Sequence, residues 1–247
     1  MKRKPLLLPV FLIWYTIGVI LQVFFTVPEV LAFSKPLFLV FYAVSLIELI
    51  WLFEQKGRAL FVGSATVGVV TFFIEVLSVE TGFPFGEYDY TSVLGPKLLG
   101  VPVTIALAWV GVLLNSLLMA SQTNKWRRAI ETGLWVVIID LILDPVAIFE
   151  SFWTWYNPGT LHYFNIPITN FISWFVIGAG LSLLFPLYHR PKQLHRSNTF
   201  VFQLMLLMFG LLAMKHGEMI VFGLSISFML LAEANYRHQF KQQRHVV

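Results

Sequence analysis

Eight apolar runs follow one another along this chain of 247 residues, and they constrain its fold more than any other feature. Most have about 20 residues, the length that a helix needs to cross the hydrocarbon core of a bilayer. Backbone groups inside a bilayer must be hydrogen-bonded within the protein, so such runs are expected to be helices. The sequence therefore predicts an all-α fold, a polytopic transmembrane bundle that forms one integral-membrane domain over residues 1–247. The expected spans are 6–27, 36–53, 59–79, 99–120, 129–149, 167–188, 199–215 and 218–235.

The basic residues predict how these spans are oriented. If the spans alternate in direction, 14 of the 17 Lys and Arg residues fall on one side, and only Lys35, Lys97 and Lys215 on the other. Cytoplasmic loops carry the excess of basic residues. We therefore expect a multi-pass protein of the cell membrane with both termini in the cytoplasm and loops 80–98 and 150–166 outside. Basic loops against anionic lipid explain the net charge of +4, so membrane lipid is the expected partner and nucleic acid is not.

Other signals are weak or missing in the sequence. The chain has no cysteine, which excludes disulfides, thiolate metal sites and a cysteine nucleophile. It shows no glycine-rich phosphate loop and no dinucleotide-binding fingerprint. Any chemistry is therefore expected within the membrane or at its surface.

An internal repeat predicts where that chemistry lies. At an offset of 65 residues, "PVTIALAW" (102–109) aligns with "PITNFISW" (167–174) without a gap. The same offset aligns the Tyr88 and Tyr90 pair with Trp153 and Trp155. We expect two units, about 59–120 and 124–185, that run in the same direction and are related by a pseudo-twofold axis along the membrane normal. In each unit a span leads to an aromatic outer loop and a returning span.

The repeat also aligns two acids that lie inside predicted spans, Glu75 and Asp140. Asp144 lies one helical turn further along the face of Asp140. Acids at such a depth are costly and usually mark a function. The same acids could instead stabilise helix dipoles or bind hydroxyl groups. Glu48, in the second run, has no role that the sequence explains.

The motifs around these acids resemble those of a known family. Residues 75–109 contain G-x-Y-x-Y-T, L-G-P and G-V-P, and residues 140–174 contain D-L-x-L-D-P, W-x-W and I-P-x-x-N-F. Together they resemble the signature regions of the carotenoid-synthesis membrane proteins, whose best-known members are acyclic carotenoid 1,2-hydratases of the bisanhydrobacterioruberin hydratase type. Ser78, Ala106 and Asn165 stand where that pattern has Gly, Pro and Gly, which leaves the exact substrate open.

The resemblance implies a hydro-lyase of carotenoid biosynthesis that adds water to the terminal double bond of an acyclic carotenoid and gives a tertiary alcohol. An isolated alkene must be protonated by a buried carboxylic acid, and a second carboxylate can orient the water and accept its proton. Electron-rich rings can stabilise the cation between these steps. Asp140 or Glu75 is the expected proton donor.

The chemistry needs no metal and no cofactor, and other enzymes of the carotenoid pathway are possible partners. The candidate catalytic residues are Glu75, Asp140 and Asp144, and the candidate substrate-binding residues are Tyr88, Tyr90, Trp109, Trp153, Trp155, Asn170 and Trp174.

Several alternatives stay open at this stage. A lycopene-cyclase-like isomerase would start from the same cation. Asp140 and Asp144 could instead hold the magnesium of a membrane prenyltransferase, and paired acids also suit a proton-coupled transporter. The aromatic pairs at 88/90 and 153/155 could simply mark the membrane interface, and Asn170 could be structural. Glu131 and Glu233 are expected to form helix-surface ion pairs with Arg127 and Arg237.

Overall fold

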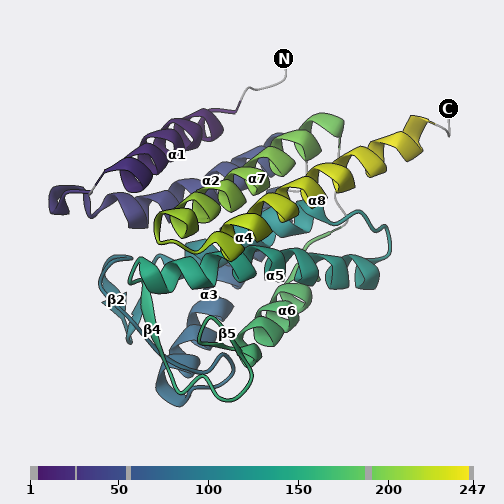
Figure 1. The fold of residues 1–247 in the computed structure, drawn as a ribbon. Helices are drawn as coiled ribbons and strands as arrows, with labels where there is room; N and C mark the ends of the chain where they lie inside the picture. The colour runs from purple at the N-terminus through teal and green to yellow at the C-terminus, as the bar shows by residue number, and fades with distance from the viewer. Residues whose placement is uncertain (1–4, 26, 54–56, 187–190, 245–247) are drawn as a thin grey trace.

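A computed structural model describes residues 5–25, 27–53, 57–186 and 191–244. Eight α-helices form the described part of the bundle, with one short 3-10 helix, η1 (Glu29–Leu31) (Figure 1). The all-α fold is confirmed. The α-helices are α1 (Leu7–Phe24), α2 (Ser34–Phe53), α3 (Gly57–Thr81), α4 (Ile105–Met119), α5 (Lys125–Phe149), α6 (Ile168–Ser182), α7 (Lys192–Lys215) and α8 (Met219–Arg244).

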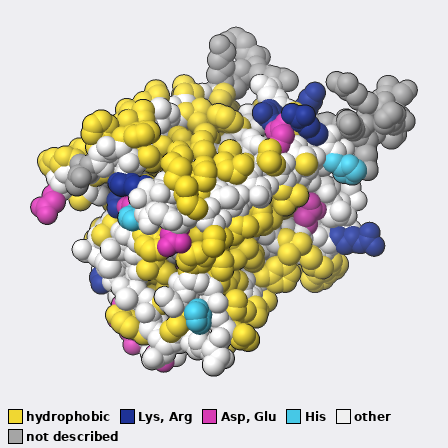
Figure 2. All heavy atoms as spheres, viewed as in Figure 1, with side chains coloured by type: hydrophobic (Ala, Val, Ile, Leu, Met, Phe, Trp, Pro, Cys, Tyr) yellow, Lys and Arg dark blue, Asp and Glu magenta, His cyan; other side chains and the backbone are white. Residues whose placement is uncertain are grey.

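Six of the described helices are long and apolar enough to cross a membrane, and the protein is a membrane protein. The surface agrees: apolar side chains cover much of the face in Figure 2, and charged side chains gather toward the ends of the helices. The two C-terminal runs form two separate helices, α7 and α8, joined by a turn in which Gly217 has φ +86°. That turn requires a left-handed backbone, which glycine adopts without strain. The ends of two predicted spans, at residues 26 and 187–188, lie outside the described residues.

Helices α4 and α6 are shorter than the spans expected at 99–120 and 167–188, because each has only 15 residues. At 1.5 Å per residue such a helix is about 22 Å long, less than a hydrocarbon core of about 30 Å. The run 99–120 loses its first residues to a small hairpin, whereas α6 begins directly after a similar hairpin and ends early, at Ser182. The number of full spans therefore stays a prediction. The hairpins pair β2 (Lys97–Leu98) with β3 (Val101–Pro102) and β5 (His162–Tyr163) with β6 (Ile166–Pro167).

Glu48, which the sequence left unexplained, binds the start of the first helix. Its carboxylate accepts hydrogen bonds from the backbone N–H groups of Leu6, at 2.9 and 3.0 Å, and Leu7, at 2.7 Å. The first N–H groups of a helix have no partner within the helix and carry a partial positive charge. Glu48 on α2 therefore stabilises the N-terminus of α1.

Of the two expected helix-surface ion pairs, one is confirmed and one is wrong. Glu233 binds Arg237 at 2.8 Å, one turn further along α8. Glu131 instead accepts from the backbone N–H of Ser121, at 2.8 Å, and from that of Gln122. The loop before α5 lies beside this carboxylate, so backbone donors replace the predicted Arg127.

The strands gather at one end of the bundle, where α3 and α5 end and α4 and α6 begin (Figure 1). There β1 (Glu87–Tyr90) pairs antiparallel with β4 (Trp153–Tyr156), which joins the loop after α3 to the loop after α5. The chain starts α1 and ends α8 on the side away from these strands. This end of the bundle carries the candidate site.

Candidate functional site

Glu75, near the strand end of α3, has both carboxylate oxygens hydrogen-bonded. Its Oε1 accepts from Trp109 Nε1 at 2.7 Å, and its Oε2 accepts from the Tyr90 hydroxyl at 2.8 Å. The Tyr88 hydroxyl donates to the same Oε2. Burial, together with the neighbouring Glu75 charge, raises the pKa of each tyrosine well above the ordinary value for tyrosine. Both phenols therefore stay protonated and can donate hydrogen bonds. Three donors around one carboxylate suit its charged form.

Asp140 and Asp144 form a second acidic group on α5. They are one turn apart on the same face, and both are fully shielded from solvent. Asn170 on α6 joins them, because its Nδ2 donates to Asp140 Oδ2 at 3.0 Å and to Asp144 Oδ2 at 2.6 Å. The other oxygen of Asp140, Oδ1, has no hydrogen-bond partner among the described residues. Two neighbouring carboxyl groups out of water disfavour being ionised together, because their like charges repel.

Strands β1 and β4 supply an aromatic wall. Alternate residues of a strand point to the same face, so Tyr88 and Tyr90 lie on one face and meet Trp155 and Trp153 across the ladder. The ring centroids of Tyr88 and Trp155 are 4.8 Å apart, and those of Tyr90 and Trp153 are 5.7 Å apart. Residues 88, 90 and 153 are buried and Trp155 is half-buried. The spacing of the two aromatic motifs thus turns four rings toward the acids.

A stack of three rings lies beside Glu75. The Trp109 ring packs on Trp174, with centroids 4.1 Å apart, and on Phe85, with centroids 6.2 Å apart. Phe85 is 1% exposed, and sequence reasoning missed it. Phe85 lies in the sequence between Glu75 and Tyr88, in a stretch rich in aromatic residues, and this position could have indicated that it belongs to the site.

Two adjoining cavities lie between the acids and the rings. The smaller, of about 20 Å³, is bordered by Glu75, Asp144 and Asn170 together with aromatic rings. About 10–15 Å³ is enough to hold one water molecule. The larger, of about 60 Å³, is almost wholly apolar and includes Ile105, Leu143 and Trp109 in its walls. The two cavities share the residues Glu75, Tyr90, Trp153 and Trp174.

All ten candidate residues therefore surround one site, although their roles stay predictions. Asp140 lies behind Asp144 and is joined to it through Asn170, and the other nine border one or both cavities. Sequence reasoning also missed Leu39 and Phe209, which border the apolar cavity from α2 and α7. They lie outside the motif regions, in runs where most positions are apolar, so no pattern distinguished them. Within the described residues no three His, Asp or Glu side chains are grouped so as to hold a metal ion.

Comparison with known proteins identifies the family. The sequence model of a family described as "Carotenoid biosynthesis protein" matches residues 34–232, which contain the whole site. This chain belongs to that family. The resemblance read from the motifs is thus confirmed at the level of the family.

A curated relative carries a more specific name. The chain is 29% identical over 167 residues to the bisanhydrobacterioruberin hydratase of Haloarcula japonica. The match covers 64% of this chain and 56% of the relative, so the chain matches little more than half the length of that protein. No solved structure matches the fold.

Proposed function

We propose that this protein adds water to the terminal double bond of an acyclic carotenoid end group and gives a tertiary alcohol, without a cofactor. The observation that carries the proposal is the pair of cavities. A space of one-water size, bordered by two acids, adjoins an apolar space that shares Glu75 and three aromatic rings with it. An alkene and a water molecule can therefore meet beside carboxyl groups. Membership of a carotenoid biosynthesis family and a relative named as a hydratase support this reaction.

The first step assigns the proton to the pair formed by Asp140 and Asp144. The pair holds one proton, and Asp144 transfers it to one carbon of the terminal double bond. The other carbon becomes a tertiary cation, and the pair becomes doubly negative. Asp144 is the delivering group because it borders the cavity, whereas Asp140 lies behind it. This choice differs from the sequence-based expectation, in which Asp140 or Glu75 is the donor and Asp144 a supporting acid. Three hydrogen bonds from neutral donors favour Glu75 as a carboxylate.

The second step captures the cation. The Glu75 carboxylate and the faces of the surrounding aromatic rings stabilise the positive charge. Water in the small cavity attacks the cationic carbon, and its proton passes to Asp144, which restores the singly protonated pair. The sum is one alkene and one water giving one alcohol. The apolar walls exclude other water that would otherwise compete for the acid or the cation.

The setting follows from the same proposal. The substrate is dissolved in the bilayer, and we infer a multi-pass protein of the cell membrane with cytoplasmic termini and the site near the outer surface. Membrane lipid surrounds it, and other enzymes of the carotenoid pathway are expected to supply the acyclic polyene.

Product mass tests the reaction. The protein is expressed in a host that makes an acyclic carotenoid, next to a matched strain carrying Asp144→Asn. A product heavier by the mass of one water molecule, formed only with the unchanged protein, supports hydration. A product of unchanged mass and altered chromatographic retention would instead identify a cyclase-like isomerase. Unchanged pigment together with proton-coupled flux of a polar solute into liposomes would identify a transporter, and a magnesium-dependent prenylated product would identify a prenyltransferase.

A further inference from the structure

Four cavities follow one another through the protein, each sharing walls only with its neighbours. The water-sized cavity adjoins the apolar cavity at Glu75, as described above. The apolar cavity adjoins a third, of about 50 Å³, through the side chains of Leu39, Leu94, Phe152 and Phe209. The third adjoins a fourth, of about 240 Å³, through Trp14, Gly18, Gln22 and Ser34. The shared walls therefore place the four cavities in one unbranched order.

The series leads from the acids to the outer surface of α1. The fourth cavity is bordered by α1 together with η1 and the start of α2, including Ile17 and Phe33. Ile17 is 54% exposed and Phe33 is 51% exposed on a helical surface of membrane-spanning character. The cavity of largest volume among the four is therefore next to an exposed apolar surface of two candidate membrane spans.

We propose that this series of cavities is the binding channel for the long chain of the polyene. The molecule enters sideways from the bilayer beside α1 and lies between α1, α2 and α7, with its end group at Glu75. The inference rests on the proposed function for the identity of the end group. It adds residues of α1, α2 and α7 to the substrate site. An unbranched series of mostly apolar cavities that ends at an acid suits an unbranched hydrocarbon chain whose end group lies at that acid.

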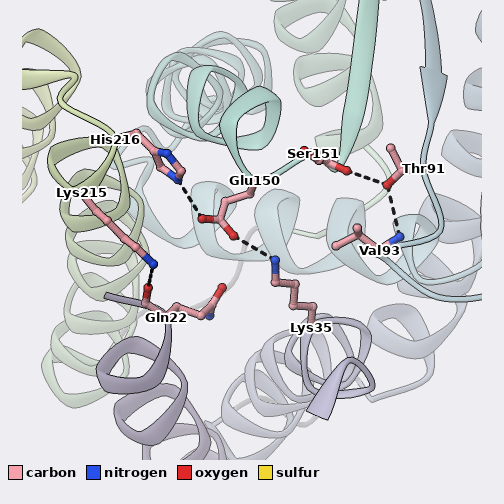
Figure 3. Close-up of polar contacts among 8 residues, drawn as sticks. All are labelled: Gln22, Lys35, Thr91, Val93, Glu150, Ser151, Lys215 and His216. Atoms are coloured by element: carbon pink, nitrogen blue, oxygen red, sulfur yellow. Dashed lines mark hydrogen bonds and ion pairs between the residues drawn. The ribbon is translucent and has the colours of Figure 1, made fainter. Parts of the chain in front are cut away.

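A polar cluster, shown in Figure 3, fixes the middle of this channel. Glu150, directly after α5, binds Lys35 Nζ at 2.9 Å and His216 Nε2 at 3.0 Å. Lys35 also lies over the ring of Phe152, 5.0 Å from its centroid. Phe152 is one of the four residues at the junction between the third cavity and the apolar one. The ends of α2, α5 and α7 thus hold Phe152 at the junction that the chain must pass.

Gly18 offers a test, because it borders both outer cavities and has space around it. A Cβ atom there would meet only the Gln22 side chain, at 3.9 Å, which is an ordinary contact. Gly18→Leu would therefore fold and fill the channel far from the acids. Gly223→Leu is the matched control, since a Cβ atom at this exposed position on α8 meets nothing within 4 Å and borders none of the four cavities.

The experiment measures two substrates with the detergent-purified full chain and each variant. One is a long acyclic polyene, and the other is a short acyclic terpene alkene with the same end group. Retention of the polyene is read from its absorbance after size-exclusion chromatography, and product formation is measured separately. Gly18→Leu should lower retention and turnover of the long polyene about tenfold or more, in the range of a blocked hydrophobic pocket. It should leave the short alkene within about twofold of the unchanged protein, as should Gly223→Leu with both substrates.

Each other result has a definite meaning. Unchanged use of the long polyene by Gly18→Leu would overturn the channel and leave the space beside α1 to a lipid acyl chain. Equal loss of both substrates by a folded Gly18→Leu would also overturn it, since the effect would not depend on chain length. If the unchanged protein retains polyene without adding water, and Gly18→Leu alone loses that retention, the channel stands and the proposed hydration fails.

Discussion

The indole rings of Trp109 and Trp174 stack on each other, with centroids 4.1 Å apart and ring planes inclined by 28°. These residues are 65 positions apart, which is the offset of the repeat proposed from the sequence. The β2–β3 and β5–β6 hairpins are separated by the same 65 positions. A pseudo-twofold axis between the two units would bring equivalent tryptophans into contact in this way. The repeat itself stays a prediction, and the stack is the contact on which we would test it.

Trp109→Phe separates stacking from hydrogen bonding. Phenylalanine keeps an aromatic face against Trp174 but removes the N–H that binds Glu75 at 2.7 Å. A hydrogen bond to a charged group contributes about 1.5–3 kcal/mol. If the hydrogen bond from Trp109 stabilises the Glu75 carboxylate mainly in the transition state, turnover should fall at least tenfold. The thermal stability of the protein in detergent should then stay unchanged. Trp174→Phe is the matched change, because no hydrogen bond from its indole to Glu75 is recorded among the described residues. Equal turnover for the two variants would contradict a specific role for the Trp109 N–H.

Trp155→Ala tests whether the strand tryptophans bind substrate or mark the membrane interface. The Trp155 ring is half-buried against Tyr88 and borders the small cavity, so its removal would widen the space where water is expected. We expect a folded protein with weaker use of the carotenoid, measured as a raised KM in a membrane assay. Trp126→Ala is the control, since Trp126 is 59% exposed and borders none of the four cavities. Unchanged KM in Trp155→Ala would favour the interfacial role.

The helices and the core of the site could be predicted because each leaves a local pattern. A run of about 20 apolar residues needs no partner to be recognised as a span. The acids stand out for the same reason: Glu75 and Asp140 interrupt such runs, where charge is costly. The aromatic pairs were recognised by their equal spacing, although the pairing of their strands was not predicted.

The rest depends on tertiary contacts that leave no local pattern. Glu48 became interpretable only when its carboxylate was found at the start of α1, 41 and 42 positions away in the chain. The shortening of α4 results from a hairpin in which Leu99 has φ +50° and Gly100 φ +80°, inside a run that is otherwise apolar. Leu39 and Phe209 are apolar residues among apolar residues, so only packing shows that they border the channel.

The predicted topology can be checked by labelling. Lys35, Lys97 and Lys215 all make contacts at the strand end of the bundle: Lys35 binds Glu150, Lys97 binds the Tyr90 carbonyl, and Lys215 binds the Gln22 carbonyl. Among the 14 basic residues that are predicted to be cytoplasmic, five lie outside the described residues: Lys2, Arg3, Lys4, Lys56 and Arg190.

Because the chain has no native cysteine, the accessibility of Asp89→Cys can be compared with that of Gln122→Cys. In intact cells a membrane-impermeant thiol reagent should label only the former. Labelling of only the latter would reverse the orientation.

The cluster around Glu150 predicts a pH-dependent stability. Burial raises the pKa of Glu150, but hydrogen bonds and charge from His216 and Lys35 outweigh it, so the pKa lies below its ordinary value. An acid whose pKa is lowered in the folded state stabilises that state above the unfolded pKa and loses this contribution as pH falls through the folded pKa. Lys35→Met should therefore lower the melting temperature at neutral pH, by an amount equivalent to about 1 kcal/mol for this partly buried pair.

The matched control for this change is Lys125→Met, at an exposed lysine for which no ion pair is recorded among the described residues. The difference between Lys35→Met and the unchanged protein should shrink as the buffer becomes acidic enough to protonate Glu150. Melting curves in detergent across this range measure it. A difference that stays constant with pH would assign the effect to lost packing on Phe152 instead of the ion pair.

The acids allow the most direct test of the mechanism. Asn keeps the size of Asp and most of its hydrogen bonds but cannot donate a proton to carbon. Asp144→Asn should therefore reduce hydration by about 10²–10⁴-fold, the usual contribution of a general acid. Asp140→Asn should also lose rate, because Asp144 then lacks the neighbouring carboxylate whose like charge favours its protonated form. Asp89→Asn is the control, because Asp89 is an exposed acid on β1, and this variant should keep its activity.

Glu75→Gln distinguishes the two assignments of the donor. If Glu75 only stabilises the cation as a carboxylate, its variant should lose rate but keep a measurable residual activity. If Glu75 is the donor, its variant should abolish hydration while Asp144→Asn keeps a residual rate. The measurement is the yield of hydroxylated carotenoid in membranes, normalised to the amount of protein. Near-normal yields from Asp140→Asn, Asp144→Asn and Glu75→Gln would mean that the proton comes from another group and that the proposed mechanism is wrong.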